Sequence, residues 1–291
     1  MMELLITLRD INNLNLFVNK CDGYIVGSKF STGFDYTLQD IQKINAYCID
    51  NNKKLYIVLD SFIEEDELDI LDNYLNELSK LNISGIYFHD LGVYTKASKY
   101  NLKDKLIYDG KTVLCNSREV KYYLDKGLNG VVISRELTYE EVKTILINNP
   151  NKVDMQIFGH LRLSYSKRKF LTNYFKQIDK DYDYINKKSL YLIEELRDYK
   201  MPIIEDNTSS QIYSDYVFEI YKEFNELKSY LNRGIIDTLF LDEEKIAKVL
   251  DDYNNLNQSN YEELLNKLNN EYPSTYSTGY FYEKTNISKD E

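Results

Sequence analysis

The sequence predicts an α/β protein folded as a TIM-like (β/α)8 barrel, with an insertion between strands 7 and 8 and helices at the C-terminal end. Short apolar runs alternate with amphipathic stretches along most of the 291 residues. This alternation is typical of a parallel sheet, open or closed, whose crossovers are helices. Several runs are almost continuously apolar, as expected for strands covered on both faces. Eight such runs favour the closed barrel.

The eight expected strands are separated by helix signals and centre on residues 4–8, 24–26, 55–59, 86–88, 106–108, 131–133, 155–158 and 235–239. Thr37 precedes one helical apolar stripe, and a leucine stripe over 68–78 predicts another helix. Two further starts have capping-box spacing, Asn116 with Glu119 and Thr138 with Glu141. The spacing therefore predicts where these helices begin.

We expect residues 1–285 to form a single barrel domain and residues 286–291 to be a disordered tail. About 75 residues separate the last two strands, which is too long for one crossover, so an insertion is expected at about 164–234. Within the insertion we expect a small β element, formed by 187–193 with 201–205, and a helix at 217–231. In the C-terminal region we expect two more helices, at 243–253 and 261–270.

The composition indicates a protein of the cytoplasm. The N-terminus lacks a basic flank followed by a long apolar run, and no stretch approaches the ~18 apolar residues of a membrane helix, so no membrane partner is expected. Three cysteines, an odd number, do not suggest a disulfide framework. The net charge of -11 disfavours broad nucleic-acid binding but leaves room for a local basic site.

The segment from Val153 to Thr172 contains such a local basic site. Its apolar strand stops at Gly159 and gives way to four cations, Arg162, Lys167, Arg168 and Lys169. No carboxylate lies between Asp154 and Asp179. Two interpretations of this composition stay open. The cations could lie at the edge of a pocket and attract an anion, or they could form a basic turn that water solvates.

The same segment resembles the signature of the peptidase U32 family, F-x-x-G-A-L-C-x-S-Y-S-G-R-C-x-L-S. The matching positions are Gly159, Leu161, Ser164, Tyr165, Ser166, Arg168 and Leu171. Further stretches resemble family elements in the same order along the chain: YFHDLG at 87–92, NSRE at 116–119, GVVISREL at 130–137, MPIIED at 201–206 and TGY at 278–280. Several ordered matches are more specific than any single one.

The resemblance implies the barrel fold and two classes of activity. Family members include collagenase-like peptidases. Others are linked to oxygen-independent hydroxylation of tRNA wobble uridine, of a ribosomal RNA base or of a ubiquinone precursor, with prephenate implied as oxygen source. The two signature cysteines fall on Arg162 and Lys169, so an iron-sulfur cluster of the family kind is not expected, because thiolates hold such clusters. No cofactor is predicted, although a divalent metal stays an option.

In a parallel barrel the carboxyl ends of the strands build the active site, so residues that follow each strand are candidates. Catalytic candidates are His89, Asp90 and His160, and substrate-binding candidates are Asp60, Arg135, Glu136, Arg162, Arg168 and Lys169. The three arginines could clamp a dianion. Several candidates also have a purely structural alternative. Each histidine could serve as a structural hydrogen-bonding group, and Arg135 could form an ion pair with Glu136. Asp60 and Asp90 could each accept hydrogen bonds from the backbone amides at the start of the next helix.

Cys115 precedes a helix start, where a thiol is either reactive or simply buried. Common hydrolytic motifs such as H-E-x-x-H and G-x-S-x-G are absent from the sequence. We therefore favour a role in or beside tRNA hydroxylation, with an anionic small molecule such as prephenate, and tRNA itself, as binding partners. A U32-type peptidase and a noncatalytic partner of a longer U32 homologue are the alternatives.

Overall fold

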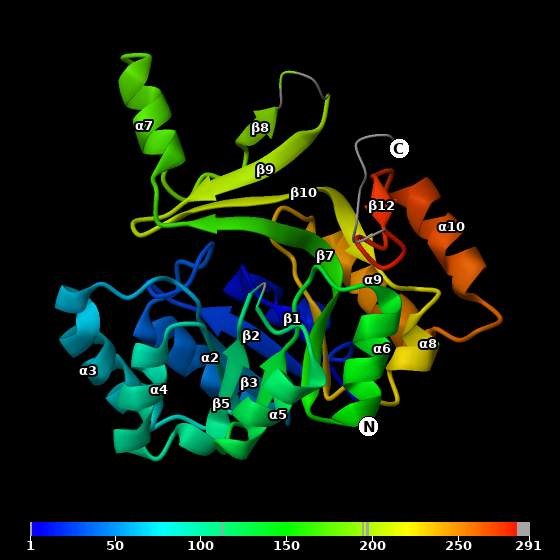
Figure 1. Ribbon diagram of the computed structural model, residues 1–291, viewed down its shortest axis with the longest axis horizontal. Coiled ribbons are helices and arrows are strands. Elements are labelled where there is room, and N and C mark those ends of the chain that lie inside the picture. The colour runs from blue at the N-terminus through cyan, green and yellow to red at the C-terminus, as the bar shows by residue number, and fades with distance from the viewer. Residues whose placement is uncertain (1, 112, 194, 196–197, 284–291) are drawn as a thin grey trace.

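The computed structural model describes residues 2–111, 113–193, 195 and 198–283, and these form a closed parallel barrel with a lobe above its mouth (Figure 1). Each barrel strand pairs in parallel with the next, and β11 pairs with both β1 and β7, which closes the ring. The barrel strands are β1 (Glu3–Thr7), β2 (Gly23–Gly27), β3 (Lys54–Leu59), β4 (Gly85–Phe88), β5 (Leu106–Asp109), β6 (Gly130–Val132), the first part of β7 (Val153–Ser166) and β11 (Arg233–Ile236). All eight predicted strand positions are confirmed.

Helices surround the barrel on its outer face. They are α1 (Leu14–Phe17), α2 (Leu38–Asp50), α3 (Leu68–Leu78), α4 (Leu91–Ala97), α5 (Ser117–Asp125), α6 (Tyr139–Asn148), α8 (Phe224–Leu227), α9 (Glu243–Asn255) and α10 (Tyr261–Glu271). Short 3-10 helices occur at Ile11–Asn13, Glu65–Glu67, Ser98–Tyr100 and Lys103–Lys105. None of the helices in the described ranges combines the length and the apolar character needed to cross a bilayer.

Side-chain caps fix several helix starts as the sequence predicts. The capping box of Thr138 with Glu141 is complete, and Thr37 forms one with Asp40. Asn116 accepts hydrogen bonds from two amides of the first turn of α5. The carboxylate of Glu119, however, accepts from the amide of Cys115 rather than from that of Asn116. The second half of that predicted box is therefore displaced by one residue.

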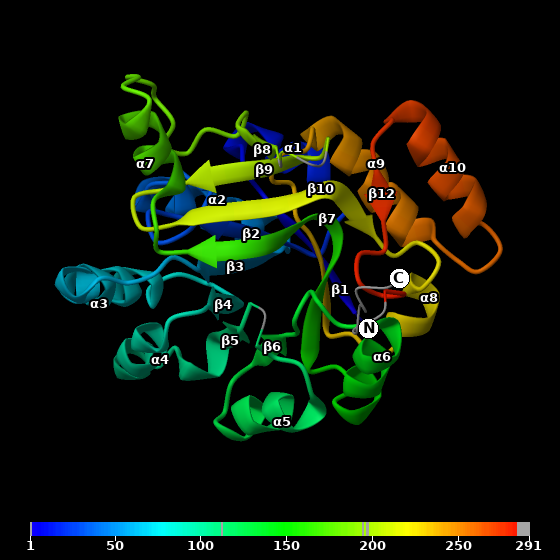
Figure 2. The same cartoon turned by 45° about the horizontal axis from the view of Figure 1, so that its top comes forward.

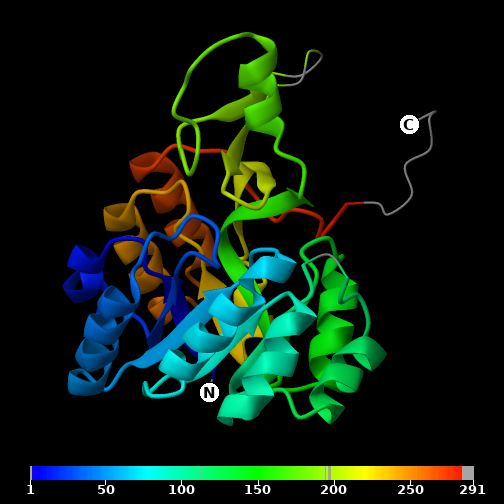
Figure 3. The same cartoon turned by 90° about the vertical axis from the view of Figure 1, so that its left-hand side faces the viewer.

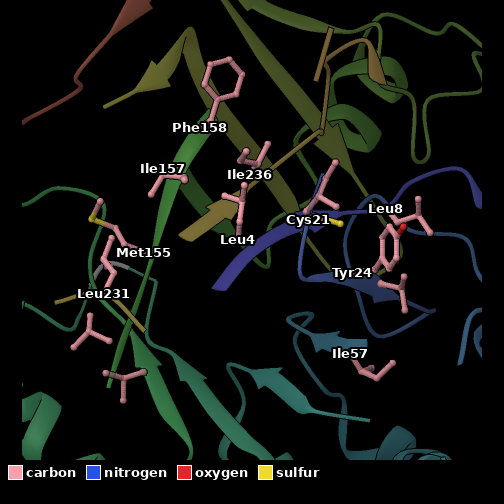
Figure 4. Close-up of a cluster of buried hydrophobic side chains, with 14 of the residues drawn as sticks. Leu4, Leu8, Cys21, Tyr24, Ile57, Met155, Ile157, Phe158, Leu231 and Ile236 are labelled. Atoms are coloured by element: carbon pink, nitrogen blue, oxygen red, sulfur yellow. The ribbon is translucent and has the colours of Figure 1, made fainter. Parts of the chain in front are cut away.

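Two apolar layers hold the barrel together. Inside the ring, a small cluster fills the middle of the barrel: Leu5, Ile25, Tyr56, Tyr87, Ile107 and Val132. A much larger cluster lies between the strands and the helices, and Figure 4 shows part of it around β1, β2, β7 and β11. Each fully buried large apolar side chain stabilises the fold by about 1.5–3 kcal/mol. The strands thus bury both faces, as a parallel barrel requires.

The insertion between β7 and β11 is an antiparallel extension of the barrel wall. β7 continues beyond the barrel to Ser166 and pairs there with β10 (Ser210–Glu219), which pairs with β9 (Lys200–Glu205) and this in turn with β8 (Tyr191–Ile193). The helix α7 (Phe170–Gln177) follows β7, and β12 (Tyr276–Ser277) pairs with β10. Figure 2 shows β7, β10 and β9 as three strands side by side. We call the described part of residues 167–205 the insertion lobe.

The predicted β element of the insertion is confirmed, but the predicted helix at 217–231 is wrong. Val217 lies in β10, opposite His160 of β7, and the only helix in this range is the short α8. The run of aromatic and β-branched residues before Glu219 favours a strand, and this preference overrides the helical spacing of the apolar positions. The predicted helices near 243–253 and 261–270 are confirmed as α9 and α10. The predicted tail, 286–291, lies outside the described residues.

Candidate functional site

Charged side chains from several strand ends converge on a small cavity at the carboxyl end of the barrel. The cavity has a volume of about 70 Å³, and Asp60, Asp109, Arg135 and Arg162 line it. Together with their ion-pair partners they form what we call the mouth cluster: Arg9, Asp60, Asp109, Lys111, Arg135, Arg162 and Asp237. The rule that strand ends carry the site therefore predicted the place of Asp60, Arg135 and Arg162 correctly.

Asp60 lies at the centre of this arrangement and is buried. Its Oδ2 accepts hydrogen bonds from Arg162 Nη2 at 2.7 Å and from Lys111 Nζ at 3.1 Å. Its Oδ1 accepts from the amide of Thr32 at 3.0 Å. The helix-start alternative for Asp60 is therefore wrong, because the amide that it binds belongs to the loop after β2, and the carboxylate also holds two cations.

A second carboxylate, Asp109, pairs with Arg135. Its Oδ2 lies 3.2 Å from Arg135 Nη2 and 3.7 Å from Lys111 Nζ. The Nε of Arg135 donates to the side chain of Gln156 at 3.3 Å. The alternative that Arg135 pairs with Glu136 is wrong, because Arg135 turns inward to Asp109 while Glu136 is exposed.

The electrostatics of the cluster favour ionised carboxylates. Burial by itself would raise the pKa of Asp60, but Lys111 and Arg162 outweigh it and hold the pKa below its usual value. For Asp109 burial is likewise outweighed, here by Arg135 and Lys111. The pKa of Lys111 is lowered by burial and by Arg162. With four cations and three carboxylates, the cluster has an excess of one positive charge.

Arg162 has donors that no described residue uses. Its Nη2 is bound to Asp60, whereas Nε and Nη1 are buried and have no hydrogen-bond partner in the described structure. The Nε of Arg9 is in the same situation. Buried guanidinium donors without partners are costly, so an acceptor at these atoms would be favourable. A cavity of about 70 Å³ has room for a group the size of a carboxylate, since one water occupies ~30 Å³ of liquid.

Lys111, Asp109, Arg9 and Asp237 were missed by the sequence analysis. Asp109 directly follows a predicted strand, and Arg9 and Asp237 lie at or beside strand ends, so the strand-end rule could have found them. Nothing in the sequence around Lys111 indicated that this residue would lie at the site. It adopts a positive φ of 61°, which is uncommon for a residue with a side chain, and the bonds of its Nζ to Asp60 and of its amide to Asp109 hold it there.

His89 borders the mouth cluster. Its Nδ1 lies 3.1 Å from the carbonyl oxygen of Asp109, so Nδ1 carries the proton and Nε2 the lone pair of the neutral ring. Burial and the nearby Lys111 lower its pKa. The ring contacts Tyr165 edge-on at 5.8 Å, and Tyr165 donates its hydroxyl proton to the backbone oxygen of Asp60. His89 is therefore a neutral proton acceptor beside the cluster.

His160 lies in a different cavity. Its Nδ1 is 2.7 Å from the carbonyl oxygen of Ser214, and the ring lines a cavity of about 190 Å³ together with Phe240 and Lys245. Burial lowers its pKa, so this histidine is also neutral near pH 7. The prediction that both histidines share one pocket is wrong. The pairing of β7 with β11 is irregular between Gln156 and Phe158, and Gly159 has a φ of 115°, so the side chain of residue 160 points away from the mouth cavity.

The other predicted residues lie outside the mouth cavity. Asp90 caps α4, and its Oδ1 accepts from the amide of Gly92 at 2.7 Å, which confirms the helix-start alternative. Arg168 is exposed and Lys169 partly exposed at the start of α7, so neither completes the predicted arginine clamp. Cys115 is an exposed residue whose thiol is only partly covered, and this partial burial raises the pKa of the thiol, whereas a reactive thiolate would need a lowered pKa.

A larger pocket of about 470 Å³ lies beside the mouth cavity. Phe34 lines both spaces, and the larger one is bounded by the loop after β2, by α3 and by the β9 to β10 turn. The hydroxyl of Thr32 connects the two walls, because its Oγ1 donates to Asp206 at 2.8 Å while its amide binds Asp60. The body of a small ligand could therefore occupy the larger pocket with one end at the mouth cluster.

Comparisons with known proteins give the family. A sequence profile described as peptidase family U32 matches residues 24–291. The chain belongs to peptidase family U32. The U32 peptidase Mk0906 has the same fold, with a TM-score of 0.51 and 12% identity over 81% of this chain and 92% of that one.

Two curated relatives of this U32 protein carry different names. The tRNA hydroxylation protein P2 of Bacillus subtilis is 26% identical over 196 residues, which cover 66% of this chain and 63% of that protein. An uncharacterized protease of Methanocaldococcus jannaschii is 28% identical over 148 residues, or 48% of this chain and 35% of that protein. The chain thus aligns with less than two thirds of the length of either relative.

The U32 signature positions now have physical explanations. Gly159 must lack a side chain, because a Cβ there would lie 2.3 Å from the carbonyl oxygen of Asp237. Glu205 caps α7, since its carboxylate accepts from the amides of Leu171 and Thr172 and from Ser210. At the first signature cysteine position stands Arg162, whose guanidinium binds Asp60. That residue and Lys169 do not fit an iron-sulfur cluster. In the described ranges, no three His, Cys, Asp or Glu side chains gather as metal ligands do.

Proposed function

We propose that this U32 protein acts in or beside hydroxylation of tRNA, at wobble uridine, without an iron-sulfur cluster of its own, and that its mouth cluster binds the carboxylate of a small anion such as prephenate. The likeness to tRNA hydroxylation protein P2 supports the pathway. The proposal of an anionic ligand rests on Arg162. This residue stands at a signature cysteine position, and two of its buried donors have no hydrogen-bond partner in the described structure.

The chemistry of the cluster supports a carboxylate ligand. The excess positive charge attracts an anion, and a guanidinium offers a planar pair of donors that matches a carboxylate. Asp60 and Asp109 hold Arg162 and Arg135 in place, so little reorganisation is needed when the ligand arrives. The neutral His89, with its lone pair on Nε2, can accept a proton or a hydrogen bond from a ligand in the adjacent space.

The pathway is tested by mass spectrometry of tRNA nucleosides from a strain that lacks this protein. We expect loss or strong reduction of 5-hydroxyuridine derivatives, restored by the wild-type chain but not by Arg162→Gln. Arg168→Gln, which removes an exposed arginine of the same strand region, is the matched control and should restore the modification. Unchanged nucleosides in the deletion strain would reject the pathway.

The anion is tested separately by thermal unfolding of the purified protein. A ligand that binds only the folded state stabilises it by RT ln(1 + [L]/Kd), so prephenate should raise the Tm in a concentration-dependent way. The rise should vanish in Arg162→Gln and persist in Arg168→Gln. An equal rise in both variants would show that the mouth cluster is not the binding site.

A peptidase is the second candidate, because a relative is named a protease and the family takes its name from that activity. Peptide cleavage by the purified wild-type chain, with or without added divalent metal, would favour it over hydroxylation.

A noncatalytic role beside a longer U32 homologue is the third candidate. Co-purification of such a homologue with the tagged chain, together with loss of the modification, would favour this role.

A further inference from the structure

The insertion lobe differs in charge from the rest of this acidic protein. In the sequence, residues 167–205 contain nine Lys and Arg and seven Asp and Glu, a net charge of +2, whereas the whole chain has -11. The remainder of the chain therefore has a net charge of -13. A polyanion would be repelled by most of the surface and attracted to the lobe.

Several cations of the lobe are available to a ligand. Lys167 and Lys187 pair with Glu64 and Asp183, at 2.7 and 3.0 Å. By contrast, Arg168, Lys176 and Lys180 are exposed, and no carboxylate of the described chain pairs with them. These three side chains therefore offer positive charge that no carboxylate in the described ranges neutralises by an ion pair.

Aromatic residues lie close to these cations in the sequence. Tyr174 of α7 is 55% exposed and meets Phe175 edge-on at 5.3 Å. Phe175 stacks on Tyr182 and on Tyr184, with ring centroids 5.1 and 5.2 Å apart. Tyr182 is itself 44% exposed. The rings support one another in fixed orientations, so stacking a further flat group on them costs little conformational entropy.

The aromatic side chains of α7 share one side of the helix. Phe170 and Tyr174 are four residues apart, so they lie on the same side. Arg168 stands just before the helix and Lys180 just after it, whereas Lys176 lies on the side opposite Tyr174. A strand of nucleotides that stacks its bases along the aromatic side of α7 would therefore have cations for its phosphates near both ends of the helix.

The insertion lobe lies above the mouth of the barrel, close to the candidate site. Figure 3 shows it rising from the barrel on the strands that leave the mouth, and β7 runs from Arg162 of the mouth cluster directly to the start of α7. A nucleic acid that lies on the lobe would therefore reach toward the mouth cavity and the larger pocket beside it.

We propose that the insertion lobe binds single-stranded RNA, with phosphates on Arg168, Lys176 and Lys180 and bases stacked on Tyr174 and Tyr182. The inference rests on the proposed role in tRNA hydroxylation and adds to it the surface that receives the RNA. A protein partner fits these observations less well, because lysine is depleted in protein interfaces whereas the lobe exposes Lys176 and Lys180 without a described carboxylate partner.

The experiment measures the affinity of the full chain for a labelled RNA hairpin with an open loop by fluorescence anisotropy. In the triple variant Arg168→Glu, Lys176→Glu and Lys180→Glu we expect at least a tenfold weaker affinity, with a shallower dependence on salt because fewer phosphates are neutralised. Tyr174→Ala should weaken binding on the order of tenfold through lost stacking. Duplex RNA without a loop should bind less tightly than the hairpin.

The matched control is Lys43→Glu, Lys80→Glu and Lys121→Glu, which changes the charge equally at three exposed lysines on the barrel helices. It should bind RNA within about twofold of wild type, since few phosphates lie near those helices. Equal weakening by both triple variants would overturn the proposal, as would absence of hairpin binding by the wild-type chain. Circular dichroism and Tm of each variant exclude unfolding as the cause.

Two further outcomes separate this inference from the proposed function. RNA binding that depends on the lobe, together with unchanged tRNA nucleosides in the deletion strain, would leave the lobe as an RNA-binding surface and reject the hydroxylation pathway. Wild-type hairpin affinity in the lobe variants, together with loss of a co-purifying protein, would identify the lobe as a protein interface and reject the RNA inference.

Discussion

Arg162 and Arg168 lie six residues apart in the same signature segment, yet the protein uses them in opposite ways. Arg162 lies at the barrel mouth, where its guanidinium binds the buried Asp60. Arg168 lies past the end of β7, exposed to solvent and without a described carboxylate partner. The contrast extends to their surroundings: the mouth cluster is a network of paired charges, whereas the insertion lobe exposes several cations, Arg168, Lys176 and Lys180 among them, that pair with no described carboxylate.

The difference teaches where charge contributes to stability and where it serves recognition. In the buried network each charge loses its hydration and depends on its partners, so removing one partner is costly. On the exposed lobe water already solvates each cation, so its loss costs the fold little. The lobe can therefore keep cations for a ligand, whereas the mouth cluster can offer only donors that its own carboxylates leave unused.

The largest effect is expected from Asp60→Ala. This change leaves Arg162 and Lys111 without their shared carboxylate in a buried site, and we expect a loss of about 3–5 kcal/mol in the free energy of unfolding. Urea denaturation of the purified protein measures it. Glu136→Ala, at an exposed position of the same barrel end, is the control and should stay within about 0.5 kcal/mol of wild type. Similar small effects for both would show that the mouth cluster is solvated like the lobe.

The next largest effect depends on pH. Burial of Glu219, at the end of β10, raises its pKa to about 7, above its usual value of 4.5. Because the folded state binds this proton more tightly, the associated stability is complete below pH 4.5 and is lost as pH rises through 7. The loss amounts to about 3 kcal/mol, at ~1.4 kcal/mol per pKa unit.

Glu219→Gln removes this titration. The variant should match wild type in stability near pH 4.5 and exceed it at pH 8, as followed by urea denaturation across that range. Glu136→Gln, an exposed counterpart, should leave the pH profile unchanged. A profile for Glu219→Gln that parallels wild type would mean that Glu219 is solvated in the folded protein.

An intermediate effect is expected where the lobe joins the barrel. Glu205 is buried and caps α7 through the amides of Leu171 and Thr172. Glu205→Ala should destabilise the protein by about 1–2 kcal/mol, the range for loss of a helix cap. Hydrogen exchange should quicken in α7 while the barrel strands stay protected, because the lobe can open locally. Faster exchange throughout the barrel would show instead that lobe and barrel unfold together.

The sequence predicted the barrel far better than the lobe, for physical reasons. Barrel strands bury both faces and so appear as apolar runs between capped helices. Beyond Phe158 the apolar residues Leu161, Leu163 and Tyr165 alternate with polar ones, the period of a half-buried strand, but the prediction ended the strand at Gly159 because the continuous apolar run stops there. The wrong helix at 217–231 arose because the end of β10 and the short α8 together have apolar residues at a helical spacing.

Within the candidate site, the strand-end rule predicted some of the side chains that meet but not all of them. Asp60, Arg135 and Arg162 do line one cavity. The rule could not foresee the irregularity of β7 before Gly159 that leaves His160 in another cavity, nor the positive φ that brings Lys111 to Asp60. Both depend on backbone conformations that tertiary contacts impose and that no spacing in the sequence encodes.

The smallest effect on stability is expected when cations of the insertion lobe are removed. This measurement tests most directly the contrast between the lobe and the mouth cluster. Arg168→Ala and Lys176→Ala should each change the free energy of unfolding by no more than about 0.5 kcal/mol, because exposed charges without partners contribute little to the fold. The measurement is the same urea denaturation used for Asp60→Ala. A loss of several kcal/mol from either change would mean that the lobe surface is held by interactions of its own, and its cations would then be structural rather than free to bind a ligand.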